Sequence, residues 1–85
     1  MDNHSFNSKV VDRDSFISFL REFLEDFKSN SDKWENNKLE LFLEAMVAYS
    51  EDIDGFYRNT GQNIDPKKPS WRLFADILKG ASMYE

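Results

Sequence analysis

The chain has 85 residues, with 16 acidic and 11 basic side chains and a net charge of −5. A chain of this length forms one small domain, and its lack of cysteine excludes disulfides and thiolate metal sites. The acidic balance disfavours nucleic acid as a partner, because phosphates are bound by Lys and Arg, and it suits a basic protein instead.

The first helix is predicted to follow a polar N-terminal segment. Residues 1–11 are expected to form a flexible tail, which leaves residues 12–85 as a single domain. Asp12 is the expected N-cap, and the helix is expected to end near Lys28, before a polar loop over residues 29–32. Apolar residues recur three and four positions apart, as in an amphipathic helix: Phe16, Ile17, Phe19, Leu20, Phe23, Leu24 and Phe27.

A second helix is predicted after Trp34, with Asn36 or Asn37 as its cap. Glu40 stands three positions after Asn37, which is the spacing of a capping box. Gly55 is expected to end the helix, because glycine is common just beyond helix C-termini. The predicted buried stripe contains Leu39, Phe42, Leu43, Met46 and Ile53.

The rest of the chain is predicted to add a short helical turn and a third helix. The turn is expected in the 53–60 region, where Phe56 and Tyr57 could pack on the core. The third helix is expected to open at Pro69-Ser70 and to become irregular after Gly80, since glycine disfavours a helix interior. The predicted fold class is therefore all-α, a compact bundle of three main helices plus this short helical turn.

The residues offer little for catalysis, metal binding or membrane insertion. His4, in the tail, is the only histidine, so neither a catalytic triad nor a His-based metal site is expected. We predict no catalytic residues, no metal and no cofactor. No apolar run approaches the roughly 18 residues of a membrane span, and the N-terminus lacks a signal-peptide pattern. We therefore expect a cytoplasmic protein without membrane contact.

The acidic run 51–55 only superficially resembles a calcium loop. A loop beginning at Asp52 would place Phe56 and Tyr57 where an oxygen ligand and a glycine are required. We interpret the run as a polar helix end. Paired carboxylates could also serve a small hydrolase, which stays a distant alternative because an 85-residue bundle leaves little room for a catalytic cleft.

Aromatic residues beside acidic ones are the better candidates for a functional surface, because large aromatics are enriched at protein interfaces. Trp34 and Trp71 fit a core role better, whereas Tyr57 fits core and surface equally well. We predict a protein-contact surface on the acidic side of the first two helices and the segment that follows them. Its candidate residues are Glu44, Glu51, Asp52, Asp54 and Tyr57.

An ordered set of motifs resembles a family of small uncharacterised bacterial proteins. The motifs are Trp34-Glu35-Asn36, Phe42-Leu43-Glu44-Ala45, Asp52, Tyr57, Pro69 with Trp71 and Phe74-Ala75, and a closing Tyr84-Glu85. Tyr49 departs from the pattern, since many members have tryptophan there. The resemblance implies a soluble bacterial domain over residues 12–85 and no known activity.

In length, acidity and helix order the chain also resembles the colicin-nuclease immunity proteins. Those proteins inhibit a basic toxin through an acidic helical surface with exposed tyrosines; Phe56-Tyr57 is the nearest equivalent of their paired tyrosines. Such a likeness concerns architecture and not activity. We interpret the chain as a non-enzymatic protein-interaction domain, an inhibitor, immunity-like protein or adaptor with one basic partner. The alternative is a self-associating structural module that forms a homodimer.

Overall fold

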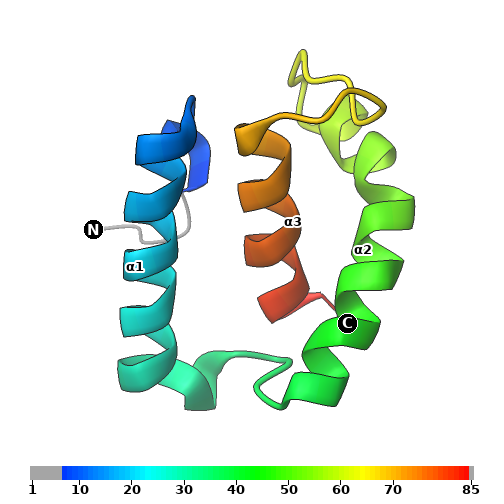
Figure 1. Ribbon diagram of the computed structural model, residues 1–85. Coiled ribbons are helices and arrows are strands. Elements are labelled where there is room, and N and C mark those ends of the chain that lie inside the picture. The colour runs from blue at the N-terminus through cyan, green and yellow to red at the C-terminus, as the bar shows by residue number, and fades with distance from the viewer. Residues whose placement is uncertain (1–6, 85) are drawn as a thin grey trace.

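Three α-helices lie side by side in the computed structural model, which describes residues 7–84 (Figure 1). Helix α1 spans Arg13–Asn30, α2 spans Leu39–Asn59 and α3 spans Trp71–Met83, and the 3₁₀ turn η2 covers Ser31–Lys33. Residues 7–84 contain no strand, so the predicted all-α class is confirmed. His4 lies outside the described residues.

Helix α1 begins where the sequence predicts. The Asp12 carboxylate accepts a hydrogen bond from the Ser15 amide at 2.9 Å, and the Ser15 hydroxyl accepts one from the Asp12 amide at 3.0 Å. This reciprocal pair is a capping box. The Ser15 hydroxyl, and then the Ser15 amide, donate to the Asp12 carboxylate and hold its pKa below its usual value. The helix continues to Asn30, and η2 occupies much of the predicted loop, so the bend after α1 is more ordered than expected.

The predicted cap of α2 is wrong. Lys38 is the N-cap, without a side-chain hydrogen bond. The Asn36 side chain instead donates to the carbonyls of Ala81 and Tyr84, at 2.9 and 2.6 Å, and the Asn36 amide donates to the Ser82 carbonyl. Asn36 therefore satisfies the carbonyls at the end of α3, because the fold brings that distant segment against the loop before α2.

Helix α2 also continues past its predicted end. Gly55 lies inside the helix, and the short helical turn expected at 53–60 is the last part of α2. Ile53 and Tyr57 are one turn apart and both buried, so their packing keeps this segment helical despite the glycine. The helix ends at Asn59, with Thr60 as its C-cap, and Gly61 follows with a φ of 68°. The Gly61 amide bonds to the Arg58 carbonyl and the Gln62 amide to the Tyr57 carbonyl, which is a Schellman motif.

Helix α3 is capped by Ser70, whose hydroxyl accepts from the Leu73 amide at 3.0 Å. The expected irregularity after Gly80 is absent, because the helix runs through Gly80 to Met83. The Tyr49 ring of α2 packs directly on Gly80 and occupies the space that a Cβ atom would need. The glycine is thus a point of close approach between α2 and α3.

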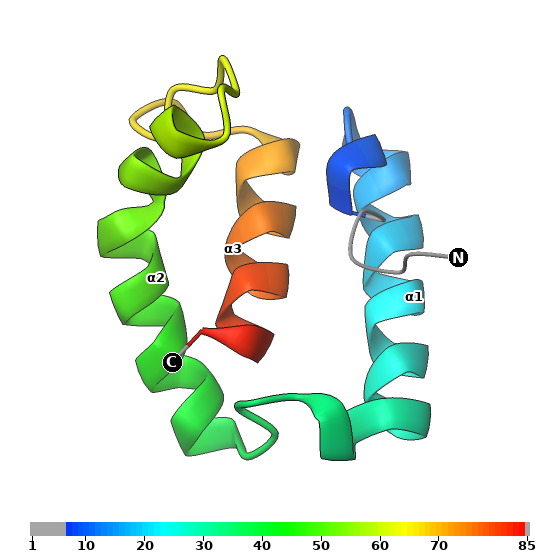
Figure 2. The ribbon, with the colours of Figure 1, turned by 180° about the vertical axis from the view of Figure 1, so that it is seen from behind.

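Helix α3 is the central element although it comes last in the chain. It packs on both α1 and α2 and lies between them in both views (Figures 1 and 2). One buried cluster, made of Val10, Phe19, Phe23 and Ala75, joins α1 to α3; a second, made of Ile53, Tyr57 and Leu73, joins α2 to α3. Val10 is 2% exposed and the Asn7 side chain donates to Asp76, so these two residues pack on the fold although they lie in the segment expected to form a flexible tail.

Candidate interaction surfaces

Helix α2 carries a strongly acidic face. It contains five acids and one base, Arg58, and all six side chains are exposed. The acids Glu40, Glu44, Glu51 and Asp54 are separated by four, seven and three residues, so they lie along one side of the helix. We call these four residues the acidic face. Helix α1, in contrast, has four acids and three bases.

The C-terminal half of α2 is hollowed beside the acidic face. A shallow hollow of about 570 Å³ lies beside Gly55, where the helix has no side chain. Asp52, Asp54 and Arg58 line it, with Phe56 and Tyr84 among the aromatic residues. We call this site the Gly55 hollow. It combines two carboxylates with aromatic walls, and it opens to solvent.

Both carboxylates of the hollow already have partners. Asp52 accepts a hydrogen bond from the Tyr84 hydroxyl, which raises the pKa of Tyr84. Asp54 pairs with Arg58 at 3.3 Å. The Gly55 amide, and then the Arg58 side chain, hold the pKa of Asp54 below its usual value. Both contacts are exposed, and an exposed ion pair such as Asp54–Arg58 exchanges partners at little cost.

Tyr57 does not belong to this surface. Only 2% of the residue is exposed, so its ring cannot form the direct partner contact that we expected. Its hydroxyl donates to Oδ2 of Asp76 at 2.6 Å. Of the five candidate residues, Asp52 and Asp54 line the hollow, and Glu51 lies one turn before Asp54 on the acidic face. Glu44 lies about two turns earlier on the acidic face, and Tyr57 lies in the interior.

Asp76 is a buried carboxylate that the sequence analysis missed. It is 3% exposed and accepts from the Tyr57 hydroxyl, from Arg72 Nε at 3.0 Å and from the Asn7 side chain at 2.7 Å. Arg72 also donates to Gln62 Oε1 at 2.6 Å. We call this end of the bundle the polar end. One signal was available: Arg72 and Asp76 are four residues apart, in the first half of a helix whose other residues up to Leu78 are apolar.

Burial and the Asp76 charge together disfavour ionised tyrosine at the polar end. Burial, and then Asp76, raise the pKa of Tyr57 well above its usual value. Burial, and then the Asp76 and Tyr84 charges, raise the pKa of Tyr49 to about 12. Neither hydroxyl is poised for proton transfer near neutral pH, so the network is suited to holding the helices together.

The two tryptophans have different roles. Trp34 fits the predicted core role, since its ring stacks on Phe23 with centroids 4.7 Å apart and its Nε1 donates to Asp26 at 2.7 Å. Trp71 does not fit the predicted core role, because it is 38% exposed and lies beside Phe16 at the edge of the bundle. The first position of a helix offers it packing on one side only.

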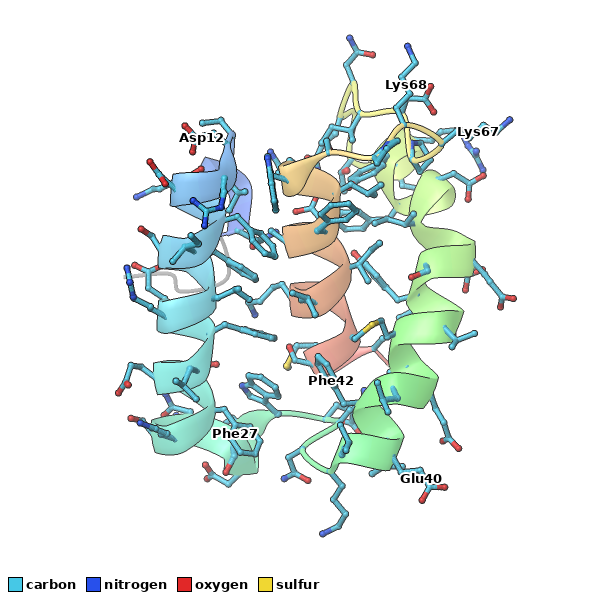
Figure 3. The ribbon with its side chains drawn as sticks, in the orientation of Figure 1. Asp12, Phe27, Glu40, Phe42, Lys67 and Lys68 are labelled. Atoms are coloured by element: carbon cyan, nitrogen blue, oxygen red, sulfur yellow. The ribbon has the colours of Figure 1, made fainter. Side chains whose placement is uncertain are left out.

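At the opposite end of the bundle, α1 and α2 border an apolar groove. Figure 3 shows Phe27 from α1 and Phe42 from α2 in the space between these helices, below the end of α3. The groove has a volume of about 370 Å³. Its lining is almost entirely apolar and includes Leu20, Leu24, Phe27, Leu39 and Phe42, with Lys38 beside Leu39. We call this end the open end. The helical spacing of the five apolar residues predicts that they belong to the core, and no pattern in the sequence indicates the groove.

The described residues show neither a metal site nor a membrane span. Within 7–84, no three acidic, histidine or cysteine side chains come together as metal ligands would. Among the same residues, every helix is too short or too polar to cross a bilayer.

Fold and surfaces together define a small all-α domain with an acidic helix face and an apolar groove. It belongs to a family of unknown function, DUF7660, whose model matches residues 12–85. No curated protein and no solved structure matches the chain. The expected membership of an uncharacterised family is confirmed, whereas the motif signature and the bacterial origin stay predictions.

Proposed function

We propose that the chain is a non-enzymatic protein-interaction domain, an inhibitor or adaptor, that binds one basic protein through the C-terminal half of α2. The observation that carries the proposal is the concentration of exposed acids on α2, five against one base, beside the Gly55 hollow. Charge of one sign on one face attracts a partner of the opposite sign and orients it before contact.

The Gly55 hollow suits a lysine or arginine side chain of that partner. Asp52 and Asp54 offer carboxylate oxygens, and the ring of Phe56, which is 40% exposed, offers an aromatic face for a cation. An entering guanidinium or ammonium would replace the Tyr84 and Arg58 contacts with a new ion pair. Because separating these exposed contacts costs little free energy, most of the attraction of the new ion pair remains available for binding.

The state of these carboxylates supports binding over hydrolysis. A carboxylic acid that donates a proton near neutral pH needs a raised pKa, which a dry and enclosed site provides. The pKa of Asp54 is lowered instead, and its hollow opens to solvent. Asp54 is therefore held as a charged acceptor, which is the state that a basic partner requires. A bacterial cytoplasmic location stays a prediction that accompanies this proposal.

The test compares two variants with the same change in net charge. The first, Glu51→Gln with Asp52→Asn and Asp54→Asn, neutralises the acids near the hollow. The control, Glu22→Gln with Glu25→Gln and Glu35→Gln, neutralises three exposed acids elsewhere. Each protein is immobilised, exposed to lysate from the source cells at low and high salt, and analysed by mass spectrometry.

We expect the wild type and the control to retain one basic protein that is released at high salt. The hollow variant should lose it, by roughly tenfold or more in recovered amount, since charged contacts at an interface are each worth about 1 kcal/mol or more. Equal recovery by the two variants would contradict the assigned surface. Recovery of no protein by the wild type would contradict the proposed function.

A further inference from the structure

We propose that a second copy of this chain covers the apolar groove at the open end, so that the protein forms a twofold-symmetric dimer. This inference goes beyond the proposed function, because it uses the N-terminal half of α2 and leaves the Gly55 hollow open. The apolar face of the dimer comprises Leu20, Leu24 and Phe27 of α1 with Leu39 and Leu43 of α2.

The apolar face is unusually exposed for side chains of this kind. Leu24, Leu39 and Leu43 are 52%, 73% and 50% exposed, and Leu39 and Leu43 are one helical turn apart. Leu24 and Leu39 line the groove and Leu43 extends it along α2, so the exposed apolar surface reaches from α1 to α2, with Lys38 as the charged side chain of the lining. A contiguous patch of this kind on a soluble domain marks an interaction site.

The two edges of the apolar face carry opposite charges. On α1, Arg21 precedes Leu24 by three residues and Lys28 follows it by four, so both flank Leu24 on the same side. Lys28 also pairs with Glu25 at 3.6 Å, but both side chains are exposed and the pair is weak. On α2, Glu40 precedes Leu43 by three residues, and Glu44 continues the acidic side. Figure 3 shows Glu40 directed away from the groove, at the outer side of α2.

The opposite charges of the two edges indicate which molecule covers the apolar face. A twofold axis that runs along the helices places the α1 edge of each copy against the α2 edge of the other, so a basic edge meets an acidic edge twice. A basic amphipathic helix in the groove would be repelled by Arg21 and Lys28, and an acidic one by Glu40 and Glu44. A second copy offers an oppositely charged edge to each of the two edges, and its leucines cover the exposed apolar side chains.

The first measurement is the mass of the wild-type chain by sedimentation equilibrium, up to a concentration of about 1 mM, the weak end of specific binding. We expect the mean mass to rise with concentration toward twice the monomer mass. A monomer mass at every concentration would overturn the proposal.

The second measurement uses two charge-reversed variants, Arg21→Glu with Lys28→Glu, and Glu40→Lys with Glu44→Lys. Each variant has two edges of the same sign and should be monomeric, with its dimer dissociation constant raised by roughly tenfold or more. When mixed in equal amounts they should pair, because each edge of one variant now meets its opposite in the other. Circular dichroism verifies that each variant stays helical. A mixture that stays monomeric would overturn the proposal, as would variants that dimerise like the wild type.

A control separates this inference from the proposed function. Glu51→Lys with Asp54→Lys makes the same change of charge on the same helix, two or more turns away from Glu44. Screening at physiological salt acts over about 8 Å, so this variant should dimerise like the wild type while it loses the basic partner. If instead it abolished dimerisation as fully as the Glu40 and Glu44 changes, net charge and not the groove edge would explain the result.

Discussion

The two ends of the bundle are held together by different kinds of interaction. At the polar end, directional hydrogen bonds from Asn7, Tyr57 and Arg72 converge on the buried Asp76. At the open end, aromatic packing stands beside the hydrogen bonds of Trp34 and Asn36: the Phe23 ring contacts both Trp34 and Phe42, and none of these bonds ends on a buried charge. Directional bonds fix one helix arrangement, whereas apolar contacts tolerate adjustment. The polar end therefore sets the fold, and the open end is free to present apolar surface.

The sharpest test of this difference is Asp76→Ala. Removing the carboxylate leaves Arg72 without its buried partner and the Tyr57 hydroxyl without its acceptor. We expect a loss of about 3–5 kcal/mol in the free energy of unfolding, as when one member of a buried ion pair is removed. Urea denaturation followed by circular dichroism measures it.

A double variant separates the cost of an unpaired charge from the loss of packing. Arg72→Met with Asp76→Leu removes both charges together, and it should recover part of the stability that Asp76→Ala loses, because apolar replacement of a buried pair is often tolerated. If the double variant is less stable than the single one, packing and not the orphaned charge dominates at the polar end.

The matching change at the open end is Phe42→Ala. The Phe42 ring lies 6.1 Å from that of Trp34, between centroids, and it is only partly buried. Its loss removes apolar contact but leaves no buried charge, so we expect a smaller cost, about 2–3 kcal/mol. Unfolding of the two variants under the same conditions gives the ratio. A larger loss for Phe42→Ala than for Asp76→Ala would reverse our account of the two ends.

Local signals allowed part of this fold to be predicted, and distant contacts decide the rest. Asp12 and Ser70 cap their helices through bonds three residues away, so the sequence reveals both. Asn36 looks like another cap, but it bonds to Ala81 and Tyr84, which no local pattern indicates. Gly55 looks like a helix end, and only the buried packing of its neighbours overrides that signal.

The candidate site shows the same limit. The acids of α2 could be placed on one face from their spacing alone. The direction of the Tyr57 side chain could not be predicted in this way, because it depends on a hydrogen bond to Asp76, 19 residues later. The groove at the open end depends on where α3 ends relative to Phe42, and no periodicity within one helix contains that information.

Between the two ends, Gly80→Ala tests how closely α2 and α3 approach. The added Cβ would overlap the Tyr49 ring, which must move, and overpacking of this kind costs about 1–3 kcal/mol. Tyr49→Leu should relieve the overlap, so Gly80→Ala should cost less in that background. Thermal unfolding of the four proteins in this cycle measures the coupling. Equal costs in both backgrounds would contradict the close contact.

High pH should loosen the packing of α2 on α3. The pKa values of Tyr49 and Tyr57 are raised above the ordinary 10.0 in the folded chain. The unfolded chain therefore loses these protons first, and stability that is intact below pH 10.0 falls as the pH rises above it. Melting temperatures measured between pH 8 and 11, a range set by the ordinary tyrosine pKa of about 10, should show this fall. Tyr57→Phe should make it shallower, and an identical pH profile for that variant would contradict the assignment.

The smallest expected effect is a gain from Gly55→Ala. The new Cβ would lie 3.8 Å from Arg58 Nη2, which is ordinary van der Waals contact. Alanine is also more stable than glycine in a helix interior. We expect about 0.5–1 kcal/mol more stability, again by thermal unfolding. The sign is opposite to that for Gly80, although both glycines lie inside helices. A loss of stability would show that this part of α2 is not a regular helix in solution.

The central place of α3 has a consequence for how the chain acquires its structure during synthesis. Since α3 lies between α1 and α2 and is made after both, a growing chain that ends before Trp71 contains neither buried cluster in full. The loop at Asn36 likewise gains its partners only when Tyr84 has left the ribosome. Because α1 and α2 meet their central neighbour last, we expect both clusters to form only after α3 has left the ribosome, with insertion of α3 as the step that completes them.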